Sequence, residues 1–184
     1  KLIYFLLLLA LILPIVFYSP ITQDVFTLPK DLVFQVLITL AFILWSIKAV
    51  IDKKIYIVKT NLNYIVLSFL MINILSLSWS VDSSLGKEDL SRLVFCIILY
   101  FLIITTIRER KQIISIINVL LFLAGLEILY SISQFFGFDP IVKNIYSGRM
   151  RMLGTIGHHN FLSEYLMMIM PLMAGVYLTT TNKY

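Results

Sequence analysis

Polar residues and glycines are concentrated in one short stretch of this apolar chain, Arg149–Leu166, which leads into the last long apolar segment. This stretch, RMRMLGTIGHHNFLSEYL, contains two arginines, two glycines, two adjacent histidines, an asparagine and a glutamate. Guanidinium groups are forked donors that suit a phosphate, and glycines let a backbone turn tightly and approach a ligand closely. These residue types at this spacing predict a binding site for an anion.

Asn160 strengthens this prediction because asparagine is a favoured N-cap residue. We expect its side chain to accept the backbone N–H of Leu162 or Ser163 and to begin the last apolar helix there. The N-terminus of a helix attracts anions through its free N–H groups and the positive end of its dipole. The stretch contains no GxxxxGK pattern and is therefore not a Walker loop; the predicted site is open to a lipid-linked phosphate or pyrophosphate.

The two histidines raise the question of a metal. His158 and His159 are adjacent, so on a regular element they are expected to point apart, and Glu164 is not on one helical face with His159. No cysteine lies nearby, and the spacing therefore predicts neither a metal site nor a cofactor. Two interpretations stay open: the histidines donate to a phosphate or carry a proton, or they are loop residues hydrogen-bonded to backbone.

The composition sets these residues in a membrane protein. Of 184 residues, 60% are hydrophobic and 14% are charged, whereas about a quarter of the residues in soluble domains are charged. The mean hydropathy is +0.95. The net charge of +5 does not indicate nucleic acid as a partner, because the basic residues punctuate apolar runs as topology signals do.

Six apolar segments are each near the ~20 residues that cross a bilayer core. They are Leu2–Tyr18, Leu32–Ile51, Leu62–Trp79, Leu90–Ile107, Ile113–Phe136 and Phe161–Thr180. The sequence therefore predicts an all-α, polytopic transmembrane helical bundle with about six spanning helices, which forms a single membrane domain over residues 1–184.

The basic residues predict the orientation of this bundle. Nine of the 15 lysines and arginines lie at the chain ends, in the joint Asp52–Asn61 or in the joint Arg108–Gln112, or beside them. By the positive-inside rule both chain ends are cytoplasmic, and the stretch Arg149–Leu166 begins on the outer side. We also expect a solvated outer loop that contains Asp82, Lys87, Glu88, Asp89 and Arg92.

Glu127 is a second candidate because it lies deep in the fifth segment, about 21 Å from Ile113 at ~1.5 Å per residue. An acid at that depth usually faces protein or a wet cavity. Tyr130, Ser131 and Gln134 share its helical face at i+3, i+4 and i+7. Two interpretations fit this stripe: one wall of a polar cavity that opens outward, or a hydrogen-bonded seam between helices.

Three motifs resemble those of the O-antigen ligase and polymerase family, and they occur along the chain in the same order as in that family. Residues 151–162, RMLGTIGHHNFL, are similar to its R-x-x-G-T-F-G-x-x-N-F-L signature, although a histidine pair replaces the more usual Asn-Pro. Residues 76–80, SLSWS, resemble its S-x-x-W-S turn. Residues 134–140, QFFGFDP, resemble its Q-x-x-G-x-D-P motif.

The resemblance implies a metal-independent membrane enzyme of surface polysaccharide and lipopolysaccharide biosynthesis in the bacterial cytoplasmic (inner) membrane. Such a glycosyltransferase moves a sugar chain from an undecaprenyl-diphosphate carrier to a glycan or lipid acceptor on the outer side. Family members have about ten or more spanning helices, so we expect this chain to be the N-terminal portion of a longer protein, and no catalytic residue is carried over. The residues expected to bind the donor are Arg149, Arg151, Gly154, Thr155, Gly157, His158, His159, Asn160 and Glu127.

Two other classes of function stay open. A transporter or flippase of lipid-linked glycan would use the Glu127 stripe to line its path, and internal repeats would favour it; none is visible in the sequence. A structural membrane subunit would use the polar stretch as an interface only.

Overall fold

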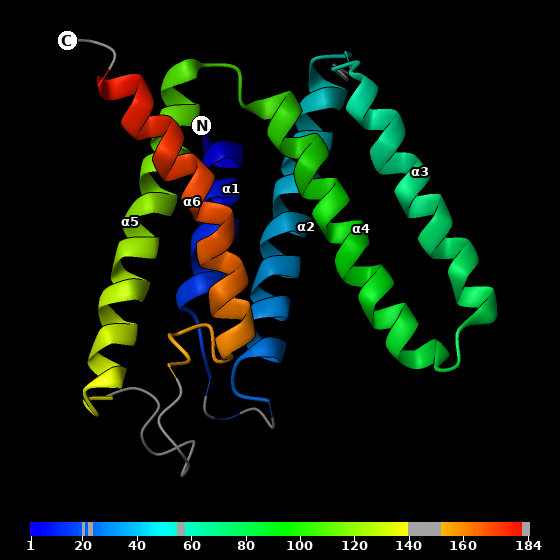
Figure 1. Ribbon diagram of the computed structural model, residues 1–184. Coiled ribbons are helices and arrows are strands. Elements are labelled where there is room, and N and C mark those ends of the chain that lie inside the picture. The colour runs from blue at the N-terminus through cyan, green and yellow to red at the C-terminus, as the bar shows by residue number, and fades with distance from the viewer. Residues whose placement is uncertain (20, 22–23, 55–57, 140–151, 182–184) are drawn as a thin grey trace. The chain divides into compact units, whose positions relative to one another are not determined.

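The part of the chain that the structure describes folds into six α-helices and one short 3-10 helix (Figure 1). The computed structural model describes residues 1–19, 21, 24–54, 58–139 and 152–181. Within these ranges there is no strand, so the predicted all-α class is confirmed. The elements are α1 (Leu2–Val16), α2 (Thr27–Ile51), α3 (Asn61–Ser76), η1 (Leu77–Trp79), α4 (Ser83–Thr106), α5 (Arg110–Phe135) and α6 (His159–Thr181).

The helices α2 to α6 are long and apolar enough to cross a membrane. They indicate a multi-pass membrane protein, as the composition predicts. Helix α1 is also apolar but has 15 residues, which is fewer than the ~20 that span a bilayer core. The number of spans and the sidedness of the chain ends stay predictions.

Helix α2 begins five residues earlier than the hydropathy pattern predicts. The carboxylate of Asp24 accepts the backbone N–H groups of Phe26 and Thr27 at 3.0 and 2.9 Å. This bonding satisfies N–H groups that the first turn of a helix leaves without partners. Pro29 is tolerated because a proline in the first turn removes no intrahelical hydrogen bond.

Helix α4 also begins earlier, so the predicted loop of charged residues is wrong. Asp82 is the N-cap, and its side chain accepts the N–H groups of Ser84 and Leu85. Glu88 and Asp89 therefore lie on the helix, where Arg92 pairs with them at 2.6 and 3.2 Å. A hydropathy pattern misses this first part of the helix because it is polar, whereas the cap and the ion pairs stabilise it.

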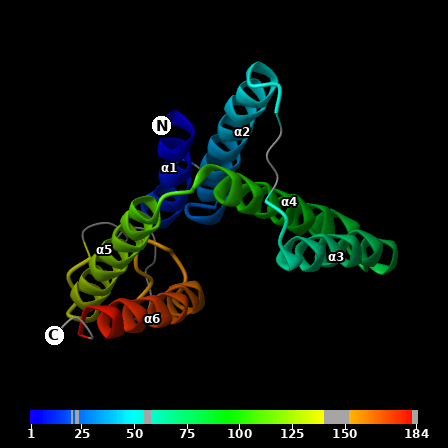
Figure 2. The ribbon, with the colours of Figure 1, turned by 90° about the horizontal axis from the view of Figure 1, so that it is seen from above.

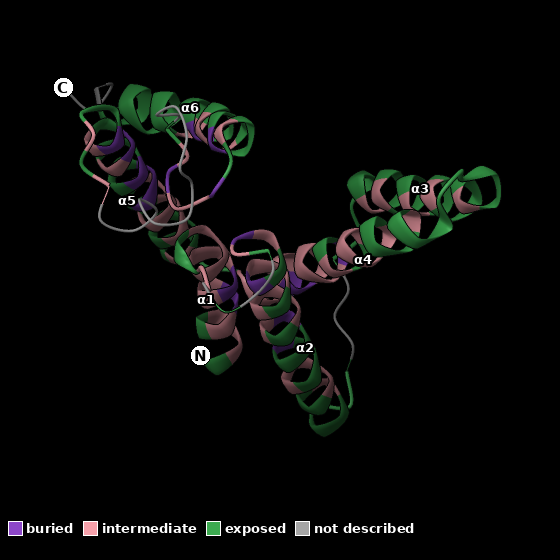
Figure 3. Ribbon diagram, turned by 90° about the horizontal axis from the view of Figure 1, so that it is seen from below, coloured by how far each residue is buried: buried purple, intermediate pink, exposed green. Residues whose placement is uncertain are grey.

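The chain divides into two compact units. The first unit comprises Lys1–Ala10 and Phe34–Glu109. Its core contains the buried side chains of Leu7, Ala10, Ile38, Ala41 and Leu102. In this unit α3 lies alongside α4 (Figures 1 and 2), and α3 has no buried residue (Figure 3).

The second unit comprises Leu11–Val33 and Arg110–Tyr184. It contains the end of α1, the start of α2, and the helices α5 and α6, which lie side by side (Figures 1 and 2). Buried positions follow one another along α5 (Figure 3). This unit contains the described candidate residues.

The cap of α4 gives a first prediction. Replacing Asp82 with Ala removes both cap hydrogen bonds and should lower the free energy of unfolding by about 1 kcal/mol. Asp89→Ala is the matched control, because the exposed pair with Arg92 contributes less. Thermal unfolding in detergent micelles, followed by circular dichroism, measures both; an equal effect of the two substitutions would contradict the assigned cap.

Candidate functional site

The glycine-containing part of the polar stretch forms a single closed turn, Leu153–Gly157. The N–H of Gly157 donates to the Leu153 carbonyl at 3.0 Å. Gly154 and Gly157 have φ angles of +60° and +90°, a region that non-glycine residues rarely adopt. The two glycines therefore permit the turn, which we call the GTIG turn (Leu153–Gly157).

Glu127 of α5 binds the GTIG turn directly. One oxygen of its carboxylate, Oε2, accepts the backbone N–H of Thr155 at 3.0 Å. The other oxygen, Oε1, is hydrogen-bonded to the Thr155 hydroxyl. The Glu127 side chain is 3% exposed, so an acid that is costly to bury is compensated by two partners on one residue.

Gln134 binds the same turn one step earlier. Its Oε1 atom accepts the N–H groups of Leu153 and Gly154 at 3.0 and 2.9 Å. Its Nε2 atom donates to the carboxylate of Asp139 at 3.1 Å, and Tyr130 donates its hydroxyl to the same carboxylate. Both ends of one amide therefore join the turn to the segment that follows α5.

The predicted stripe on α5 is confirmed as one face of the helix. Glu127, Ser131 and Gln134 are all buried, and Tyr130 is half-buried. Two interpretations of this stripe were open, a cavity wall and a seam between helices. The observed partners of Glu127 and Gln134 are backbone N–H groups of the GTIG turn. Ser131 lies between the two acceptors, and its buried hydroxyl has no hydrogen-bond partner among the described residues.

Two groups that the sequence did not indicate complete the contacts of Thr155. The Lys30 ammonium donates to the Thr155 carbonyl at 2.8 Å and to the Ile15 carbonyl at 3.3 Å. The Thr155 hydroxyl is also 2.7 Å from the Ile15 carbonyl. Ile15 lies in the last turn of α1, where carbonyls lack intrahelical donors. A carbonyl gives no side-chain signal, and a lysine at the start of α2 looks like a topology signal.

Both glycines approach protein side chains closely. A Cβ atom on Gly154 would lie 2.5 Å from Oε2 of Glu127 and 3.2 Å from Leu162. A Cβ atom on Gly157 would overlap the ring of Phe26, which is 4% exposed. The turn is thus packed against α5 on one side and against the start of α2 on another.

His158, rather than the predicted Asn160, caps α6. Its carbonyl accepts the Leu162 N–H at 3.0 Å, and its Nδ1 atom accepts the Asn160 N–H at 3.2 Å. The helix begins at His159, so Asn160 is already its second residue. The turn ends at Gly157 and leaves the next residue in the cap position, which explains the shift.

The two histidine rings stack, although adjacent residues on a regular element are expected to point apart. Their centroids are 4.6 Å apart with an interplanar angle of 23°, and His158 also contacts the ring of Phe161. The expectation is wrong because His158 precedes the helix and does not follow helical geometry. Among the described residues, no group of three or more His, Cys, Asp or Glu side chains is arranged to hold a metal.

The candidate residues thus divide into an anchored set and an exposed set. Gly154, Gly157 and Glu127 are buried, Thr155 and His159 are half-buried, and His158 and Asn160 are exposed. The structure brings Glu127, Thr155 and Gly154 into contact. Arg149 and Arg151 lie outside the described residues, so their predicted contact with an anion is not tested.

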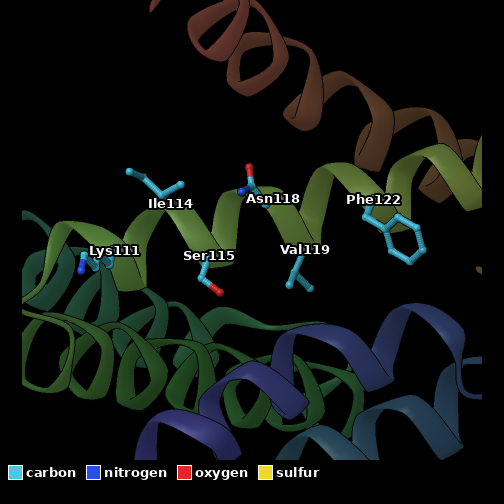
Figure 4. Close-up of a pocket in the computed structure, with 6 residues that line it drawn as sticks. All are labelled: Lys111, Ile114, Ser115, Asn118, Val119 and Phe122. Atoms are coloured by element: carbon cyan, nitrogen blue, oxygen red, sulfur yellow. The ribbon is translucent and has the colours of Figure 1, made fainter. Parts of the chain in front are cut away.

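A separate hollow of about 400 Å³ lies along the first half of α5 (Figure 4). Its lining residues all belong to α5: Lys111, Ile114, Ser115, Asn118, Val119 and Phe122. Figure 4 shows Ser115 and Asn118 on different sides of the helix. Ligand sites bring a few polar groups together, so this hollow is not a candidate site.

Comparison with protein-family models, with curated proteins and with solved structures found no match for this chain.

The close packing of Gly157 and the open space beside Gly175 give a second prediction. Gly157→Ala places a Cβ atom against Phe26 at a φ of +90° and should lower the free energy of unfolding by more than about 1 kcal/mol. Gly175→Ala on α6 is the control, because nothing lies within 4 Å of its added Cβ and alanine favours a helix. Unfolding in detergent tests this, and equal stability of the two variants would refute the assigned packing.

The amide of Gln134 gives a third prediction. Gln134→Glu removes the donor to Asp139 and puts a second carboxylate beside it, which should cost about 1–3 kcal/mol of stability. Gln112→Glu makes the same change near the start of the same helix and should cost less. The comparison is made by chemical unfolding in micelles. A Gln134→Glu variant as stable as the Gln112→Glu control would show that the amide does not join the two segments.

Proposed function

We propose that this chain belongs to a membrane glycan ligase or polymerase of surface polysaccharide biosynthesis. Its donor is a sugar chain on undecaprenyl diphosphate, and its acceptor is a glycan or a lipid at the outer side of the bacterial cytoplasmic membrane. The proposal comes from the three motifs, two of which lie in the second unit.

One observation carries the proposal. The Q-x-x-G-x-D-P motif and the R-x-x-G-T motif are 17 residues apart when counted from Gln134 to Arg151, yet the Gln134 amide bonds to both. It donates to Asp139 of the first motif and accepts the N–H of Gly154 in the second. The two motifs, which the resemblance to the family singles out, are therefore parts of one hydrogen-bonded structure. This arrangement supports the proposal that they act together.

The exposed side of this structure suits a diphosphate. Helix α6 begins one residue beyond the GTIG turn, after the cap residue His158, and the positive end of its dipole attracts an anion there. His158 and Asn160 are exposed at this helix start. In the proposed site Arg149 and Arg151 bind the diphosphate, since forked donors suit phosphate oxygens.

The reaction in this proposal is a displacement at the anomeric carbon of the donor sugar. An acceptor hydroxyl forms a new glycosidic bond to that carbon while the bond to the carrier's diphosphate oxygen breaks. The electron pair leaves with the diphosphate, whose growing negative charge Arg149, Arg151 and the helix start stabilise. The hydroxyl proton passes to a base, and no residue of this chain is assigned that role.

A fourth prediction follows for Arg151. Arg151→Ala in the intact protein should abolish glycan transfer, because the leaving diphosphate loses a cationic partner, while membrane insertion stays normal. Arg110→Ala, at the start of α5, is the control. The assay uses purified protein in phospholipid vesicles with the undecaprenyl-diphosphate-linked glycan and its acceptor, and gel analysis of the joined product.

Two outcomes would count against the proposal. Normal transfer by the Arg151→Ala variant would remove the assigned role of the arginine. Movement of the donor across vesicles of the wild-type protein, without joined product, would instead favour a transporter of lipid-linked glycan.

A further inference from the structure

Thr155 is held through all three of its polar groups. Its N–H and hydroxyl contact Glu127 of α5, its carbonyl accepts from Lys30 of α2, and its hydroxyl lies against the Ile15 carbonyl of α1. Three helices, α1, α2 and α5, therefore meet at one residue of the GTIG turn.

The two charged side chains match the partial charges of the Thr155 backbone. The carboxylate of Glu127 faces the N–H of Thr155, and the ammonium of Lys30 faces its carbonyl. Hydrogen bonds with one charged partner are roughly twice as strong as neutral ones, and the low dielectric of a buried site strengthens them further. Lys30 and Glu127 thus hold opposite ends of a residue in the turn.

The carboxylate of Glu127 is hydrogen-bonded within the chain. Both of its oxygens bond to Thr155, and the side chain is 3% exposed. Lys30 donates to two carbonyls and lies 5.8 Å from the centre of the Phe26 ring. Neither group is arranged as a direct ligand of a donor, whereas both fix the residue that stands three positions before the α6 cap, His158.

We propose that Lys30 and Glu127 are positioning residues that hold the GTIG turn so that the start of α6 receives the donor diphosphate. The role of the diphosphate rests on the proposed function. Release of either side chain from Thr155 loosens the turn, so the donor binds less well while the later chemical step is little changed.

The first arm of the test measures the turn itself. Amide hydrogen exchange of the peptide that covers Leu153–Thr155 is followed in the protein in phospholipid nanodiscs. Lys30→Met keeps most of the side-chain stem but removes the donor, and exchange should rise at least tenfold. Lys30→Arg keeps the charge and should stay close to wild type. Lys87→Met, an exposed lysine of α4, is the control.

Glu127 completes this arm. Glu127→Gln keeps an acceptor for the Thr155 N–H and should have a smaller effect than Glu127→Ala. The double variant Lys30→Met with Glu127→Ala should exchange little faster than the more affected single variant, because both side chains hold the same residue. Additive effects, or an unchanged exchange rate in both single variants, would overturn the positioning role.

The second arm measures glycan transfer at varied donor concentration. Lys30→Met should raise KM for the donor about tenfold and change kcat less. Lys30→Arg should keep KM close to the wild-type value. A fall in kcat at unchanged KM would contradict the proposal. If wild-type protein joins no glycan, the proposed function fails, and the exchange arm still decides whether Lys30 and Glu127 order the turn.

If Lys30→Met does not fold, Thr155→Val takes its place. It keeps the shape of the side chain and removes the hydroxyl between Glu127 and Ile15. Its exchange should rise, and its KM should increase. Wild-type values in both measurements would overturn the proposal.

Discussion

The burial of a carboxylate and an amide on one face of α5 is the constraint on which the second unit depends. An unpaired polar group in such a place costs about 1–3 kcal/mol, and more if it is charged. Glu127 and Gln134 meet this requirement with three consecutive backbone N–H groups, those of Leu153, Gly154 and Thr155. N–H groups that converge in this way suit an anion. Here the side-chain oxygens of Glu127 and Gln134 accept their hydrogen bonds, so the buried acceptors and the backbone donors satisfy each other.

The geometry of the turn follows from these bonds. Three neighbouring N–H groups point to α5 only if the backbone bends sharply, and the positive φ of Gly154 provides this bend. The second positive φ, at Gly157, brings the chain over Phe26 and sets His158 at the start of α6. The position of the helix start is therefore a consequence of contacts made several residues earlier.

The sequence predicts the parts of this arrangement that depend on periodicity. Spacing alone puts Glu127, Ser131 and Gln134 on one helical face, and hydropathy finds each α-helix of the described residues. Starts of helices are harder, since Asp24 and Asp82 stabilise polar first turns that hydropathy overlooks, although N-cap preference points to such residues. The sequence does not predict the contacts of Lys30 and of the Ile15 carbonyl with Thr155, because these contacts depend on which segments meet in space.

The hydrogen bond between Glu127 and the Thr155 backbone is the most direct test of this account. Solid-state NMR of the protein in lipid bilayers measures the distance from the Thr155 amide nitrogen to the Glu127 carboxyl carbon. A direct N–H···O hydrogen bond requires the amide nitrogen to lie within about 4 Å of the carboxyl carbon, and we expect such a distance. A separation beyond about 6 Å would contradict it, since the buried carboxylate would then have a different partner and the turn a different anchor.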